Sequence, residues 1–307
     1  MSKLVVSTYP HIKDKQTKNR IMLYVILALL PAIAAAIYFF GTHALLIIII
    51  SILTAFITDL ILQRITKNII KGINLSAILT GLLLALILPP TVELWIPAIG
   101  VIFAIAIAKY AFGPGNAIFN PALVGRIFLV NAFPALTSTW IWPDGVTGAT
   151  PLNIAKLEGF SVLHQRFGAT LYQRLFFGDI AGSLGETSAL ALLIGGIFLI
   201  IIKVIDWRVP LTYISTVFVL SFIFKQNPLF SILAGGLFLG AFFMATDYAT
   251  TPLTKKGRFI FALGCGILTV IIRIYSSFPE GVAYSILLMN AFTPLIERYT
   301  KPRIFGK

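Results

Sequence analysis

A short segment of small and hydroxyl-bearing residues is the part of this sequence best suited to carry chemistry. It lies at 144–151, reads Asp-Gly-Val-Thr-Gly-Ala-Thr-Pro, and contains the tetrad Thr147, Gly148, Ala149 and Thr150. A threonine hydroxyl is a weak nucleophile on its own, but small neighbours leave it open to another enzyme that would esterify it with a phosphate-bearing group. We therefore expect Thr150 to be a modification site, in a turn that the side chain of Asp144 caps.

On its own the tetrad is a weak signal. Such a tetrad arises by chance in roughly a few per cent of chains of this length, and an ordinary Asp-Gly turn would explain the same residues. Four further motifs stand elsewhere: Phe-Asn-Pro-Ala-Leu-Val-Gly-Arg at 119–126, Phe-Met-Ala-Thr-Asp at 243–247, Phe-Pro-Glu-Gly-Val-Ala-Tyr at 278–284 and Leu-Met-Asn at 288–290. With these motifs in this order, nearly the whole chain resembles the D subunit of the Rnf complex, a family shared with the B subunit of the sodium-translocating NADH:quinone reductase.

The resemblance implies two flavin sites. In that family the last threonine of the tetrad, here Thr150, carries FMN through a phosphoester bond made by a flavin transferase, with Asp144, Thr147, Gly148 and Ala149 around it. The related quinone reductase protein holds a non-covalent riboflavin with two asparagines and an aspartate. These correspond to Asn116, Asn120 and Asp247, although the spacing of the asparagines departs slightly from that pattern.

The resemblance also implies an activity and partners. It is that of a ferredoxin:NAD oxidoreductase coupled to Na⁺ or H⁺ transport, whose other membrane and peripheral subunits hold iron–sulfur clusters and flavins. One alternative is the B-type component of a quinone reductase, although such proteins usually have a longer polar lead than the 20 residues present here. A cofactor-free channel or transporter is the alternative from another class. It would need neither Thr150 nor a polar insertion of about 50 residues.

Composition indicates an all-α polytopic membrane protein in contact with lipid. Of the 307 residues, 58% are hydrophobic and 11% are charged, whereas soluble domains carry about 25% charged residues. The net charge of +13 does not indicate nucleic-acid binding, because the basic residues lie between apolar runs and form no stripe. Cys265 is the only cysteine, which excludes an internal disulfide and an iron–sulfur site built from this chain alone.

Ten apolar runs predict about ten transmembrane helices in two inverted five-helix repeats. The runs lie at 21–40, 44–61, 74–88, 94–108, 117–133, 187–202, 210–224, 228–246, 259–274 and 281–296. Several are nearer 15 residues than the roughly 20 of a simple span, which indicates short or broken helices around a polar site. The expected division is a cytoplasmic lead at 1–20, membrane halves at 21–133 and 187–298, an extracytoplasmic insertion at 134–186, and a cytoplasmic tail at 299–307.

Basic residues orient the predicted spans. With the amino terminus inside, 18 Lys and Arg residues fall on the inner side and 4 on the outer side, while Arg126 and Arg273 lie within spans. Because cytoplasmic loops carry the excess of Lys and Arg, both termini are expected in the cytoplasm of a prokaryotic plasma membrane. The insertion with Thr150 is then extracytoplasmic.

The remaining polar residues each have two interpretations. Asp247 either belongs to a functional site or pairs with the basic loop at 255–258, and Asp59 is expected to pair with Arg64. Arg126 and Arg273 either contact a flavin or pair with acids such as Glu280. Trp140 and Trp142 either stack on an isoalloxazine ring or belong to an interfacial aromatic belt.

Overall fold

The computed structural model describes residues 17–66, 74–113, 117–276 and 280–301, and these fold into helices joined by short connections. Within those ranges the only β-type pairing is one isolated antiparallel bridge between Ile141 and Thr147. Each of the ten predicted apolar runs coincides with a helix or a pair of short helices. The all-α prediction is therefore confirmed for the described residues.

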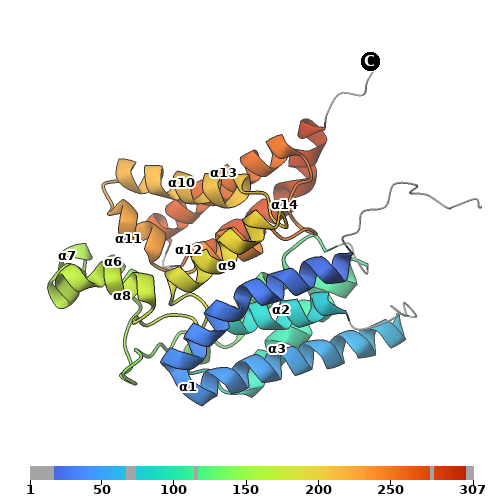
Figure 1. Cartoon of the computed structure of the whole chain (residues 1–307), viewed down its shortest axis with the longest axis horizontal. Helices are drawn as coiled ribbons and strands as arrows, with labels where there is room; N and C mark the ends of the chain where they lie inside the picture. Colours follow the sequence, from blue (N-terminus) through green and yellow to red (C-terminus); the bar gives the residue numbers. More distant parts are fainter. Residues whose placement is uncertain (1–16, 67–73, 114–116, 277–279, 302–307) are drawn as a thin grey trace, which may run out of the picture.

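The first two runs form one element, α1 (Lys18–Ile65), which is broken at Gly41. Gly41 has φ 69° and ψ −154°, values that a residue with a side chain rarely adopts, so the chain reverses there without a loop. The two arms of α1 meet at this bend (Figure 1). Pro31 lies within the first arm, and the Thr17 hydroxyl caps the start of the helix by accepting from the Arg20 amide.

Shorter helices complete the first half of the chain. They are α2 (Leu75–Leu86), α3 (Trp95–Phe103), the π-helix η1 (Ala104–Ala111) and α4 (Pro121–Ala132). In the second half the helices are α9 (Ala189–Ile201), α10 (Arg208–Ile223), α13 (Lys255–Tyr275) and α14 (Val282–Thr300). In the described residues, only α1 and α13 combine the length and apolar composition that a membrane span requires, so the number of spans and the inverted repeat stay predictions.

The run at 228–246 is broken, as its glycines indicate. It consists of α11 (Pro228–Leu233), α12 (Leu237–Leu239) and the π-helix η3 (Gly240–Met244), with Gly235 at φ 74° in the break. A broken helix leaves carbonyl groups without partners, which is costly away from water. Arg273 of α13 supplies the missing donors: its Nη1 bonds the Ser231 carbonyl at 2.6 Å and its Nη2 bonds the Ala234 carbonyl at 3.1 Å.

Small residues allow the two halves to pack closely, and large apolar residues face outward. A Cβ on Gly195 of α9 would overlap the Ala28 carbonyl oxygen of α1, so these backbones touch. The outer face of α10 carries Leu211, Val219, Phe222 and Ile223, each more than half exposed. An apolar exposed surface of this extent is typical of helices that contact lipid.

The polar insertion forms a small helical unit at one end of the molecule. Its helices are α5 (Pro134–Thr137), α6 (Pro151–Leu157), α7 (Phe160–Phe167), the 3₁₀ turn η2 (Gly168–Thr170) and α8 (Leu171–Phe177). Their apolar side chains form a second core with residues of α11. In Figure 1, α6–α8 lie at one end, while the start of α1 and the end of α14 lie at the other.

Candidate functional site

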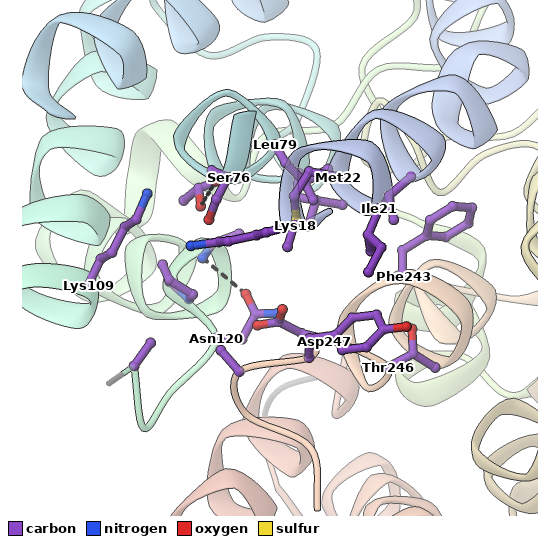
Figure 2. Close-up of a pocket in the computed structure, with 18 of the residues that line it drawn as sticks. Lys18, Ile21, Met22, Ser76, Leu79, Lys109, Asn120, Phe243, Thr246 and Asp247 are labelled. Atoms are coloured by element: carbon purple, nitrogen blue, oxygen red, sulfur yellow. Dashed lines mark hydrogen bonds between the residues drawn. The ribbon is translucent and has the colours of Figure 1, made fainter. Parts of the chain in front are cut away.

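A cavity of about 920 Å³ opens between the helices at the end of the molecule remote from α6–α8. The polar residues of its wall are Lys18, Asn74, Ser76, Thr80, Lys109, Tyr110, Asn120, Thr246, Asp247 and Tyr248. Apolar residues such as Met22, Leu79, Leu83 and Phe243 supply much of the rest. In Figure 2, Lys18 and Lys109 approach from one side and Asn120 and Asp247 from the other. Mostly apolar walls with a few converging polar groups are what a cofactor site requires.

Asn120 joins three helices beside this cavity. As the N-cap of α4, its Oδ1 accepts from the Ala122 amide at 3.1 Å and the Leu123 amide at 3.4 Å. Its Nδ2 lies 3.4 Å from the Met244 carbonyl of η3, and its backbone amide donates to Oδ1 of Asn290 on α14 at 3.1 Å. The Asn-Pro motif thus holds the cavity wall together as well as lining it.

Asp247 follows η3 and lines the same cavity, so the structure brings together two of the three predicted inner-site residues. Its carboxylate accepts from the Thr250 hydroxyl at 3.4 Å. In the basic loop that was the alternative partner, Arg258 pairs with Asp206 at 3.0 Å. The third predicted residue, Asn116, lies outside the described residues.

The prediction that Asp59 pairs with Arg64 is wrong. The Asp59 carboxylate, with a side chain only 3% exposed, pairs with Lys109 Nζ at 3.2 Å. It also accepts from Tyr110 Oη at 3.0 Å, Asn74 Nδ2 at 3.0 Å and Gln63 Nε2 at 2.5 Å. Three of these four donors, Asn74, Lys109 and Tyr110, line the cavity, so one carboxylate behind the wall fixes three residues in it.

Sequence reasoning missed most of the cationic side of this cavity. Lys18 and Lys109 entered the prediction only as charges that orient the chain, and Asn74 and Tyr110 only as residues at the ends of spans. The available signal was their shared position at predicted inner helix ends, which places them at the same depth as Asp247. A lysine that follows an apolar run directly, as Lys109 does, is already a candidate for an internal partner.

The predicted attachment segment forms a tight turn. The Trp142 amide donates to the Val146 carbonyl at 2.8 Å, and the Gly145 amide donates to the Trp142 carbonyl at 2.9 Å, with Gly145 at φ 85°. Oδ1 of Asp144 accepts from the Val146 amide at 3.2 Å, which confirms the expected cap. The turn itself is exposed, including Thr147.

Thr150, in contrast, is only 5% exposed. It is the N-cap of α6, and its Oγ1 accepts from the Asn153 amide at 3.3 Å. The free space beside it is a cavity of about 10 Å³, whose wall includes Gly182, Gly235, Glu186 and Glu280. A flavin does not fit into that space, so an FMN on Thr150 would have to extend away from it, toward the exposed turn.

The two tryptophans before the tetrad are engaged by protein groups. Trp142 stacks on Phe167 with ring centroids 5.1 Å apart, and a Cβ on Gly148 would lie 2.6 Å from its Nε1. Gly148 is therefore required for the close approach of this indole ring to the backbone. The guanidinium of Arg126 lies 5.8 Å from the Trp140 ring, a cation–π contact.

Charged residues surround the buried side of Thr150. Arg126 Nη2 lies 3.8 Å from Oε2 of Glu280, which favours the predicted pairing with an acid over a flavin contact. Burial raises the pKa of Glu186 to about 8, with the neighbouring Glu280 carboxylate adding to the rise and Arg126 opposing it. Glu186 therefore keeps its proton near neutral pH and adds no negative charge to this wall.

The sequence as a whole decides the family. A family model described as NQR2, RnfD, RnfE matches residues 5–306. The chain belongs to that family. The match extends over both halves and the polar insertion, so the inner cavity and the attachment segment both lie inside it.

Three relatives, each the D subunit of an oxidoreductase complex, show how close the match is. The chain is 46% identical to that of the proton-translocating ferredoxin:NAD(+) oxidoreductase complex of Clostridium ljungdahlii, covering 98% of this chain and 96% of that one. It is also 46% identical to that of the Na(+)-translocating ferredoxin:NAD(+) oxidoreductase complex of Acetobacterium woodii, covering 99% and 95%. For that of the ion-translocating oxidoreductase complex of Stutzerimonas stutzeri the identity is 38%, covering 95% and 93%.

Proposed function

We propose that this chain is the membrane-embedded D subunit of a ferredoxin:NAD oxidoreductase complex that translocates a cation, and that it carries electrons between two flavins. One is FMN, esterified by a flavin transferase to Thr150, and the other is a non-covalent flavin, such as riboflavin, in the cavity of Asn120 and Asp247. The cavity is the observation that carries the proposal. Residues of two distant motifs, at 119–126 and 243–247, line one space of about 920 Å³, within the range of sites for ligands of this size.

The position of the two sites gives the proposal its physical content. Lys18, in the cavity wall, lies at the start of α1, at the opposite end of the molecule from α6 and Thr150 (Figure 1). If both ends of the molecule reach the membrane surfaces, an electron that passes between the flavins crosses the bilayer. Each elementary charge moved in this way exchanges about 2.3 kcal/mol per 100 mV with the membrane potential. The protein holds and tunes the flavins, which supply the redox chemistry.

The relatives favour this assignment over the alternatives. All three relatives named above are D subunits, which supports the Rnf-type complex over the B-type component of a quinone reductase. The chain is equally similar to a proton-translocating and to a Na⁺-translocating relative, at 46% identity each, so the proposal includes both cations. Its partners are the other membrane and peripheral subunits, which supply iron–sulfur clusters and further flavins.

Counting flavins tests the proposal directly. The full chain, produced together with a flavin transferase and purified in detergent, should show an intact mass increased by one FMN. Acid extraction of the same sample should release a second flavin in a near-stoichiometric amount. A chain of unmodified mass that releases no flavin would contradict the proposal and favour a cofactor-free transporter.

Cysteine labelling tests the orientation. In a Cys265→Ala background, Ser161→Cys in α7 and Lys256→Cys at the start of α13 each replace an exposed residue. An impermeant maleimide should label Ser161→Cys on intact cells and Lys256→Cys only after the membrane is opened, because the basic loops are expected inside. Labelling in the reverse order would refute the proposed transfer of electrons across the membrane.

A further inference from the structure

The cavity has an asymmetric arrangement of charge. Among the residues that the structure describes, the charged members of its lining are Lys18, Lys109 and Asp247. Asp59 lies behind the wall and pairs with Lys109 at 3.2 Å. This lining therefore carries one net positive charge, and Asp59 balances it from outside the ligand space.

The Asp59–Lys109 pair is shielded from solvent. The side chains are 3% and 11% exposed, and the carboxylate has three further donors within 3.0 Å, namely Tyr110, Asn74 and Gln63. These donors come from the second arm of α1, the N-cap of α2 and the π-helix η1, so the carboxylate is fixed from several directions. A charge held in this way acts on a neighbouring ligand at low effective dielectric constant.

We propose that Lys109, held by Asp59, is the cation that sets the reduction potential of the flavin in this cavity. The inference rests on the function proposed above. An isoalloxazine that receives one electron and no proton, or two electrons and one proton, gains one negative charge. The electrons come from an iron–sulfur or flavin centre of a neighbouring subunit. The Lys109 ammonium stabilises the added charge, and Asp59 limits how far this stabilisation goes. Asp59 is thus a positioning and tuning residue that does not touch the ligand.

This assignment predicts shifts of opposite sign from the two members of one ion pair. Asp59→Asn keeps an acceptor for the surrounding donors and leaves the Lys109 charge unbalanced, so the potential should rise. Lys109→Met leaves the Asp59 charge unbalanced, so the potential should fall. The double variant Asp59→Asn/Lys109→Met carries neither charge and should return close to the wild-type value.

The measurement is a spectroelectrochemical titration of the purified full chain in a Thr150→Val background, which leaves the cavity flavin as the only one bound. At a fixed applied potential, the ratio of reduced to oxidised flavin should change on the order of tenfold in each direction. A unit charge at about 10 Å has an effect of this size at an effective dielectric constant of about 20. Arg64→Met is the control: it removes a cation from the same end of α1, at an exposed position outside the cavity wall, and should leave the ratio unchanged.

The outcomes separate this inference from the proposed function. A wild-type chain without extractable flavin contradicts the proposed function. Bound flavin with equal potentials in all variants, or shifts of the same sign in both single variants, overturns the role of Lys109. If Lys109→Met loses its flavin, Lys109→Gln, which keeps a donor for Asp59, must show the same fall in potential. Loss of flavin from every variant, the double variant included, assigns the cluster a purely structural role and also overturns the inference.

Discussion

The inner cavity and the outer hydroxyl present opposite designs for holding a flavin. The cavity of Asn120 and Asp247 has a volume of about 920 Å³ in the chain alone, and its polar wall is fixed by Asp59. Thr150 adjoins a space of about 10 Å³, and its hydroxyl is buried and engaged in capping α6. One region is prepared for a ligand, and the other is closed around its own side chain.

The difference follows from how each ligand would be retained. A non-covalent ligand must be held by contacts alone, so ordering the site in advance reduces the cost of binding. A covalent bond needs no such preparation. It does need a moment when the hydroxyl can be reached by a second enzyme. In this fold that requires the start of α6 to separate from Gly182 and Gly235. We therefore expect attachment to precede the final packing of α6.

The largest expected effect is the loss of covalent FMN from Thr150→Val. Valine keeps the shape of threonine but has no hydroxyl to esterify, so the FMN adduct should disappear completely from the intact mass. The flavin extracted from the inner cavity should remain. Thr147→Val is the matched control, because it removes the exposed hydroxyl of the same tetrad and should keep the adduct. An adduct that follows Thr147 would move the outer site by one turn.

The next largest effect is expected at the inner cavity. Asp247→Ala removes the only carboxylate that the described residues place in the wall, so acid-extractable flavin should fall about tenfold while the adduct at Thr150 persists. Asp206→Ala is the control: this acid pairs with Arg208 and Arg258 in an adjoining pocket and does not line the cavity. Equal losses in both variants would indicate a general weakening of this end of the molecule.

A smaller effect should follow from crowding the attachment turn. In Gly148→Ala the new Cβ would meet Trp142 and displace it from Phe167, which distorts the segment that a transferase would bind. We expect the fraction of chains with the FMN adduct to fall several-fold, without a change in extractable flavin. Gly182→Ala is the control, since its Cβ makes an ordinary contact of 3.4 Å with Thr187. Full occupancy in Gly148→Ala would show that the indole position is irrelevant to attachment.

The smallest expected effect is on the pH dependence of stability. Because the pKa of Glu186 is raised to about 8 in the folded chain from an ordinary value of 4.5, its contribution is complete below pH 4.5 and is lost as the pH rises through 8. The melting temperature of the wild type should therefore fall over this window. Glu186→Gln cannot ionise and should flatten that fall by a few degrees. Glu158→Gln, at an exposed position of the same insertion, should leave it unchanged.

Much of this architecture follows from the sequence, because apolar runs have to become helices wherever backbone groups lack water. The meeting of Asn120 and Asp247 followed from motif resemblance and from their shared inner side. The partner of Asp59 did not follow. Arg64 is five residues away and turns off the helix face, whereas Gln63, four residues away, lies on the same face and does donate to Asp59. Lys109 is 50 residues away, and only tertiary packing brings it there.

The burial of Thr150 could not be predicted either. A segment of small and hydroxyl-bearing residues predicts an accessible turn, and the structure has such a turn up to Thr147. Thr150 is covered because distant loops at Gly182 and Gly235 close over the start of α6. Those contacts depend on how the insertion packs against the broken helix α11–α12, which no local pattern encodes.

The two π-helices also bear on how this chain acquired its cavity. The wider turn of a π-helix corresponds to one extra residue inserted into an α-helix. Deleting one residue from η1 would rotate everything beyond it by about 100° relative to α3, and Lys109 would leave the wall. The same deletion in η3 would turn Asp247 away. Two single-codon insertions, one in each half of the gene, are therefore sufficient to convert plain helices into the opposing walls of this cavity.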